Sequence, residues 1–147
     1  MATRSRIGIR IGNETRSIYC HWDGYLENNG RILLEHYSDR NKVEELISLG
    51  DISSLRESIG KPFGHSFDTP VEGHTVFYHR DRNENWDNVQ PQTFTKTKSL
   101  SQYMADCKNY LFSEEYAYVF DTKINKWKYW SGKGWRLLTK KNTTEKI

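Results

Sequence analysis

Cysteine, aliphatic side chains and long hydrophobic runs are all scarce in this chain. Its 147 residues include two cysteines, and isoleucine, leucine and valine together number 25. The longest uninterrupted hydrophobic run, Tyr116–Phe120, has five residues, whereas a membrane-spanning helix needs roughly 20. The composition therefore excludes collagen-like, coiled-coil and membrane-spanning chains.

Aromatic side chains compensate for the missing aliphatic ones. Five tryptophans, nine tyrosines and six phenylalanines make up 14% of the chain. Because each aromatic ring buries a large apolar area, strands rich in such rings can fold where a solvated tail cannot. The length suits one domain of ordinary size, so we expect a single domain with an unusually aromatic core.

The two cysteines, Cys20 and Cys107, are far apart and lack the spacing of a metal site. Arginines on both sides of the short apolar stretch 7–9 interrupt any secretion signal at the start of the chain. Two free thiols in a reducing cytoplasm are therefore the default expectation.

The net charge of +3 conceals an uneven distribution. Residues 1–16 carry four arginines against one glutamate, and residues 121–147 carry eight basic residues against two acidic ones. Residues 17–120 carry 10 basic and 16 acidic residues. Basic ends suit an anionic partner such as a nucleotide, a nucleic acid or an acidic protein surface, although solvation is the simpler explanation for any single lysine.

Hydrophobic alternation predicts an antiparallel hairpin near the start of the chain. Ile7, Ile9 and Ile11 alternate with polar residues, a turn follows at 12–14, and a second alternating segment covers 17–23. Five side chains would then share the polar face of this hairpin: Arg6, Arg10, Tyr19, His21 and Asp23.

Helical spacing and a capping pattern mark the middle of the chain. Residues 31–37 and 43–47 have apolar side chains at helical spacing, and residues 52–59 predict a further turn or two. Ser99 begins a capping box in front of a helical stripe over 100–111. These helices are expected to cover the sheet to which the hairpin belongs.

Further strands complete the expected fold. Residues 75–80 predict a strand, 80–90 a polar loop, and 116–138 an antiparallel meander. We therefore expect one α+β domain over residues 1–139, with a mainly antiparallel sheet and helices packed on one face. Residues 140–147 are expected to form a frayed basic tail.

Catalytic and metal-binding motifs are missing from the sequence. The five histidines include no HExxH pattern and no i, i+4 pair, and there is no CxxC, GxSxG or P-loop. His21 and Asp23 share a strand face, which suits two metal ligands but is explained more simply as an exposed polar face. The sequence therefore predicts no cofactor, no metal and no catalytic residue, and it favours a non-enzymatic protein.

Two other segments carry candidate ligand-binding residues. Arg80 and Arg82 lie in a dense charged stretch at a strand end, and their guanidinium groups suit a phosphate. In the hairpin 123–136, basic residues alternate with aromatic ones, as on surfaces that bind single-stranded nucleic acids. Core packing and a charged sheet edge explain most of this hairpin, but Trp130 lies on the lysine face and is kept as a candidate.

Four segments of the chain resemble a group of small bacteriophage proteins. They are Arg4–Ile9, Ser17–Tyr25, Leu33–Tyr37 and Glu115–Phe120, the last followed by the tryptophan-rich hairpin. The resemblance covers most of the chain and implies a phage protein that acts in the cytoplasm of the host cell. It implies no catalytic residue, because none is assigned in that group.

The phage resemblance also shapes the expected function. Small phage proteins of this size often bind a host defence enzyme or sequester a nucleotide signal. Since the polar hairpin face offers the charged, stacking and hydrogen-bonding groups that a nucleotide needs, we expect a phage accessory protein that counteracts host defence by binding a nucleotide-derived immune signal.

Three alternatives to that function stay open. The first is inhibition of a host defence protein by direct binding, and the second is nucleic-acid binding through the hairpin. The third is hydrolysis of a nucleotide signal by His21 or His79. No membrane partner is expected, and the aromatic sheet edges also suit a homo-oligomer.

Overall fold

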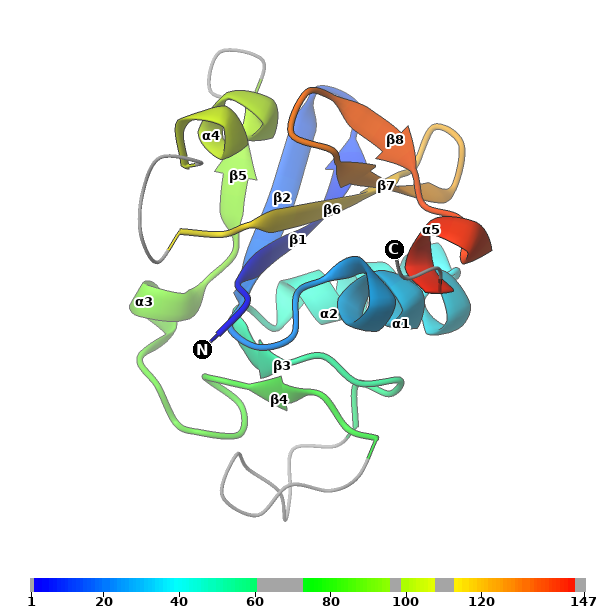
Figure 1. Ribbon diagram of the computed structural model, residues 1–147. Helices are drawn as coiled ribbons and strands as arrows, with labels where there is room; N and C mark the ends of the chain where they lie inside the picture. Colours follow the sequence, from blue (N-terminus) through cyan, green and yellow to red (C-terminus); the bar gives the residue numbers. More distant parts are fainter. Residues whose placement is uncertain (1, 61–72, 96–98, 108–112, 145–147) are drawn as a thin grey trace.

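The computed structural model describes residues 2–60, 73–95, 99–107 and 113–144 (Figure 1). Its strands are β1 (Ser5–Ile11), β2 (Glu14–Cys20), β3 (Ile52–Ser54), β4 (Val76–Phe77), β5 (Gln92–Phe94), β6 (Tyr116–Asp121), β7 (Lys126–Trp130) and β8 (Trp135–Leu137). Its helices are the π-helix η1 (Leu26–Gly30), α1 (Arg31–His36), α2 (Arg40–Ser48), α3 (Trp86–Val89), α4 (Leu100–Cys107) and α5 (Lys140–Thr144). These elements form a single α+β domain, as expected.

The eight strands form one mixed sheet in the order β4-β3-β2-β1-β6-β7-β8, and β5 pairs with β2 outside this path. The pairs β1–β6 and β2–β3 are parallel, whereas the other pairs are antiparallel. The prediction of a mainly antiparallel sheet is therefore confirmed.

The central strand β1 is the first arm of the predicted hairpin. In its register with β2, Ile7 lies opposite Ile18 and Arg6 lies opposite Tyr19. Gly12 makes the turn with a φ of 62°, a conformation that costs glycine little because it has no Cβ. On its other side β1 pairs in parallel with β6, so that strands from the first and the last third of the chain lie side by side in the middle of the sheet (Figure 1).

The main core lies on one face of the sheet, under α1 and α2. Isoleucines of β1 and β2 pack there against apolar residues of both helices, together with five buried aromatic residues: Tyr37, Phe77, Tyr118, Phe120 and Trp127. The polar groups on three of these rings donate to backbone carbonyls, and the Tyr37 hydroxyl does so to Arg56 at 2.8 Å. Trp127 Nε1 donates to the Tyr37 carbonyl at 2.8 Å, and the Tyr118 hydroxyl donates to the Gly24 carbonyl at 2.6 Å. The aromatic core predicted from composition is thus present.

A second, smaller core lies on the opposite face of the sheet. Leu100 and Met104 of α4 pack there on Ala117 and Val119, which alternate along β6 with residues of the main core. Ser99 caps this helix as the sequence predicts, because its Oγ accepts a hydrogen bond from the Gln102 N–H at 3.1 Å. Helices therefore cover both faces and not the single face expected from the sequence, with α4 on the face that carries the polar side chains of the hairpin.

The helical turn expected over residues 52–59 is wrong, because Ile52–Ser54 forms the strand β3. The His21 N–H donates to the Ile52 carbonyl at 3.2 Å, and the Trp22 N–H donates to the Ser53 carbonyl at 3.0 Å. The end of β2 thus offers hydrogen-bond partners to the backbone of this segment. Ile52 and Leu55 are fully buried in the extended conformation, so a helix would gain no further burial.

Two other short helices depart from the expectations. The polar loop expected over 80–90 contains α3, and the frayed tail expected from residue 140 begins with α5. Thr139 and Asn142 cap α5 reciprocally. The Thr139 N–H donates to Asn142 Oδ1 at 2.8 Å, and the Asn142 N–H donates to Thr139 Oγ1 at 3.2 Å. Thr143 is buried, so packing against η1 and α1 holds this segment in place. Residues 145–147 of the expected tail lie outside the described residues.

Candidate functional site

Strand alternation places a row of polar side chains on the face of the sheet that α4 covers, which we call the α4 face. Arg6 and Arg10 of β1 share this face with Thr15, Ser17 and Tyr19 of β2. The predicted polar face of the hairpin is therefore present. Its members do not form one cluster, however, because Arg10 lies at the turn end of the hairpin and Tyr19 at the opposite end.

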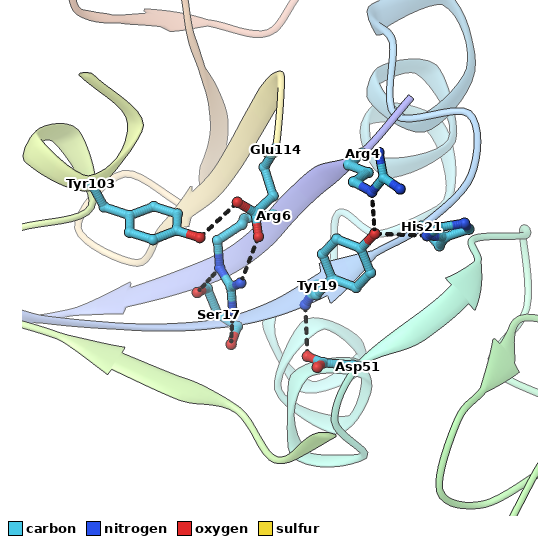
Figure 2. Close-up of polar contacts among 8 residues, drawn as sticks. All are labelled: Arg4, Arg6, Ser17, Tyr19, His21, Asp51, Tyr103 and Glu114. Carbon is cyan, nitrogen blue, oxygen red and sulfur yellow. Dashed lines mark hydrogen bonds and ion pairs between the residues drawn. The ribbon is translucent and has the colours of Figure 1, made fainter. Parts of the chain in front are cut away.

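Arg6 is buried in the middle of this face and bound to neighbouring residues (Figure 2). Its Nε donates to Ser17 Oγ at 2.9 Å, and its Nη1 pairs with Glu114 Oε1 at 3.2 Å. The other Glu114 oxygen accepts a hydrogen bond from the Tyr103 hydroxyl at 2.6 Å. The guanidinium also lies 5.8 Å from the centre of the Phe94 ring. Arg6 therefore joins the sheet to α4 and to the segment before β6.

Tyr19 links an arginine to a histidine at the other end of the face (Figure 2). Its hydroxyl accepts a hydrogen bond from Arg4 Nε at 2.9 Å and lies 2.7 Å from His21 Nδ1. The Tyr19 hydroxyl has one proton of its own to donate and Nδ1 lies within hydrogen-bond distance, so we assign this proton to the bond with Nδ1. The proton of a neutral His21 ring then resides on Nε2. The ring also packs edge-on against Trp22, with 4.6 Å between the ring centres.

Both members of the Tyr19–His21 pair are uncharged near neutral pH. Burial raises the pKa of Tyr19 to about 12, against the lowering effect of Arg4. Burial also lowers the pKa of His21, and the positive charges of Arg4 and Arg82 lower it further. The pair is therefore a neutral hydrogen-bond relay next to two cations.

Arg82 comes to this cluster from the loop after β4. Its guanidinium lies 5.4 Å from the centre of the Tyr78 ring, and its charge acts on both Tyr78 and His21. The charged stretch around residue 80 and the hairpin thus meet in space, as neither segment by itself indicates. We call Arg4, Tyr19, His21, Tyr78 and Arg82 the Tyr19 cluster.

Asp51 supports the Tyr19 cluster from the start of β3 and was missed by the sequence reasoning. Its Oδ1 accepts a hydrogen bond from the backbone N–H of Tyr19 at 2.7 Å (Figure 2). Burial raises the pKa of Asp51 to about 6, although the Tyr19 N–H and the charge of Arg6 act in the opposite direction. No sequence signal marks this residue, because Gly50–Asp51 has the composition of an ordinary turn.

Three other residues considered in the sequence analysis have structural roles outside the Tyr19 cluster or lie in a turn. Arg80 donates to the Ile59 and Gly60 carbonyls at 2.9 and 3.2 Å and pairs with Asp81 at 2.9 Å, so it holds the loop after β4. Asp23 has a φ of 56° in the turn after β2. His79, the other histidine considered for catalysis, binds the Glu84 carbonyl at 2.9 Å.

Arg10 lines a pocket of about 210 Å³ at the turn end of the α4 face. The pocket lies between β1, β2, β5, the start of α4 and the β6–β8 strands. Its lining combines two cations, one anion and two aromatic rings: Arg10, Lys128, Asp121, Phe94 and Trp135. Ser99 and Ser101 from the first turn of α4 line it as well, so that the positive end of the helix dipole faces this space.

The charges of the Arg10 pocket sum to one positive charge. Lys128 Nζ lies 3.0 Å from Asp121 Oδ2. Burial alone would raise the pKa of Asp121, but hydrogen bonds from Lys128 and the Lys123 N–H, with the charge of Arg10, lower it. Asp121 therefore stays ionised and neutralises one of the two cations.

The aromatic residues of the C-terminal hairpin serve both cores. Trp127 is buried against Phe120 with 5.4 Å between the ring centres, and Trp130 packs edge-on against Trp135 at the same distance. Trp135 is fixed in turn by a hydrogen bond from its Nε1 to Ser101 Oγ at 2.7 Å. The candidate Trp130 therefore lies beside a ring that lines the pocket.

Neither a membrane-spanning helix nor a metal cluster is found in the described ranges. No helix there is long and apolar enough to cross a membrane. Among the same residues, no group of three or more histidine, cysteine, aspartate or glutamate side chains is placed to hold a metal ion. Comparisons with models of protein families, with curated proteins and with solved structures found no match.

Proposed function

We propose that this protein binds a nucleotide-derived anion in the Arg10 pocket and releases it chemically unchanged. The observation that carries the proposal is the lining, in which the cations Arg10 and Lys128 lie beside the rings of Phe94 and Trp135. Pockets for small ligands are typically apolar hollows with a few convergent polar groups, as this one is. Nucleotides present the complementary combination of a flat ring and a phosphate.

Each part of the pocket has a role in this proposal. The phosphate lies near Arg10 and Lys128, at the positive end of α4, because helix N-termini stabilise anions. The base packs against Trp135, whose orientation is fixed by its bond to Ser101. With one net positive charge in the lining, the pocket favours a ligand of low negative charge, such as a phosphate monoester or diester.

The biological role follows from the resemblance to small phage proteins. A phage protein that binds a nucleotide-derived immune signal without consuming it lowers the free concentration of that signal in the host cell. In that role the protein counteracts host defence as a sponge. The proposal needs no catalytic residue, in keeping with the missing catalytic motifs.

Isothermal titration calorimetry against cyclic nucleotides and ADP-ribose derivatives tests the proposal. We expect saturable heat with at least one of them and a loss of about tenfold or more in affinity for Arg10→Ala. Arg16→Ala is the matched control, because Arg16 is exposed on the same hairpin but belongs to the opposite face. Absence of heat with every compound, or equal losses for both variants, would overturn the proposal.

Recovery of the ligand separates a sponge from a hydrolase. After saturation with the binding compound, the protein is denatured and the released nucleotide is analysed by chromatography. A sponge returns the intact compound, whereas a hydrolase using His21 or His79 returns products. Products that still form at the wild-type rate in Arg10→Ala would place the activity outside the pocket and contradict the proposal.

A further inference from the structure

The Tyr19 cluster brings together cations from two distant segments around one neutral histidine. Arg4 precedes β1, His21 follows β2, and Arg82 belongs to the loop after β4. The positions of Arg4 and His21 are fixed by their hydrogen bonds to the Tyr19 hydroxyl at 2.9 and 2.7 Å. Arg82 packs over Tyr78 and is exposed. This arrangement is separate from the Arg10 pocket, because none of its five residues lines that pocket.

The hydrogen-bond relay determines which atom of His21 can meet a ligand. Nδ1 is occupied by the Tyr19 hydroxyl, so the remaining ring nitrogen, Nε2, carries the proton of the neutral ring. His21 is partly exposed, and its ring shares the Tyr19 hydroxyl with the Arg4 guanidinium, while the charge of Arg82 also acts on it. Donors of this kind, next to arginines, recognise the oxygens of a phosphate group.

The nearby acidic groups are engaged by other partners. Asp51 accepts the Tyr19 N–H and lies beneath the cluster, and Glu114 is shared by Arg6 and Tyr103. Among the residues that the structure describes, the charged groups that act on the pKa of His21 are the cations Arg4 and Arg82. The local potential at Nε2 is therefore positive.

We propose that the Tyr19 cluster is a second binding site, specific for a phosphate-like oxyanion, in which Arg4 and Arg82 supply the charge and His21 Nε2–H donates a hydrogen bond. The proposal is independent of the ligand in the Arg10 pocket. The oxyanion is either free inorganic phosphate or the phosphate of a nucleotide, and the test below separates these sources.

Anion binding at this site is coupled to proton uptake. Burial and the charges of Arg4 and Arg82 hold the pKa of His21 below its ordinary value when no anion is bound, and a bound anion offsets the charge of the two arginines. The pKa of His21 rises on binding, so the bound state takes up a proton in the pH window between the two values. Affinity for the anion must therefore increase as the pH falls through that window.

NMR titration of the histidine ring signals between about pH 5 and pH 8 measures this coupling directly. Sulfate is the probe, because its charge is constant over this range, and chloride at equal ionic strength is the reference. We expect the pKa of His21 to rise in sulfate by at least about 0.5, while the ring signals of His36, which is exposed at the end of α1, should not respond to the exchange of chloride for sulfate. An unchanged His21 pKa in saturating sulfate would overturn the proposal.

Substitutions in the cluster distinguish a binding site from a general salt effect. Arg82→Ala removes an exposed cation, so we expect the pKa of His21 in the absence of a bound anion to rise. The further rise of this pKa in sulfate should be severalfold smaller than in the wild type. Arg136→Ala, which removes an exposed arginine from β8, is the matched control and should leave both values unchanged. An equal sulfate response in the wild type and in Arg82→Ala contradicts the proposal.

Two further arms address Asp51 and the source of the oxyanion. Asp51 also titrates near the cluster, so the sulfate-induced rise in the pKa of His21 must persist in Asp51→Asn.

Titration with inorganic phosphate and with adenosine monophosphate then shows which source of the oxyanion binds more tightly. Arg10→Ala should leave the sulfate response intact, so this site and the pocket can fail separately. Loss of the response in Asp51→Asn or in Arg10→Ala would refute the site as described.

Discussion

Arg6 and Glu114, which are 108 residues apart in the sequence, form an ion pair of 3.2 Å on the α4 face. Their side chains are 4% and 9% exposed, so each charge is stabilised mainly by its partner in place of water. The Tyr103 hydroxyl donates to Glu114, and Arg6 Nε donates to Ser17 Oγ. Removing one partner of a buried pair leaves an uncompensated charge, which costs more than the pair itself contributes.

Glu114→Ala should therefore lower the free energy of unfolding by about 3 kcal/mol. Urea denaturation followed by tryptophan fluorescence measures this value. Glu35→Ala is the control, because Glu35 forms an exposed i, i+4 pair with Arg31 at 4.0 Å and should cost about 0.5 kcal/mol or less. Similar costs for the two variants would show that the Arg6 charge is solvated after all.

Asp51 makes stability depend on pH in an unusual direction. Burial raises its pKa from 3.8 to about 6 in the folded protein. Between about pH 4 and pH 6 the unfolded chain releases the proton that the folded protein retains, so the contribution of Asp51 to stability decreases as the pH rises through this window. Asp121, whose pKa is lowered by its partners, acts in the opposite direction, so the effect must be isolated by a substitution.

Asp51→Asn isolates this effect, because an asparagine oxygen can still accept the hydrogen bond from the Tyr19 N–H. We expect the variant to match the wild type near pH 4 and to exceed its stability at pH 7 by on the order of 1–2 kcal/mol, a figure reduced for partial exposure. Urea denaturation at several pH values measures the difference. A constant difference from pH 4 to pH 7 would contradict the raised pKa.

The hydrogen bond between Trp127 and Tyr37 fastens the C-terminal strands to α1. The indole N–H donates to the Tyr37 carbonyl at 2.8 Å within the main core. Trp127→Phe retains a ring but leaves this carbonyl without the indole donor, so we expect a loss of about 2 kcal/mol in thermal or urea unfolding. Trp130→Phe, at a partly buried position, should cost about 1 kcal/mol or less. The reverse order of costs would refute this role of Trp127.

Local patterns predicted those parts of the fold that depend on near neighbours. The alternation of Ile7, Ile9 and Ile18 determines which side of the hairpin is buried, since a shift by one residue would expose all of them. Ser99 marks the start of α4 because its side chain caps the backbone N–H three residues later. The polar face of the hairpin was predictable for the same reason, with Arg6, Arg10 and Tyr19 on one side.

The remaining features depend on contacts between distant segments, on which local patterns carry no information. Ile52 has helical spacing with Leu55, yet it joins the sheet because β2 offers backbone partners there. The hairpin sequence likewise groups Arg6 with His21, but the ion pair with Glu114 buries Arg6, whereas Arg82 from a later loop acts on His21.

The sequence by itself thus determined the α+β class, the hairpin, the helix caps and an aromatic core, because alternation, capping and burial act between residues close along the chain. Only the tertiary structure decided which polar residues share a site. The parallel pairing of β1 with β6 places Asp121 and Lys128 beside Arg10, and the course of the chain after β4 places Arg82 beside His21. Electrostatic and hydrogen-bonding partners are selected by distance in space, which the chain establishes only when it folds.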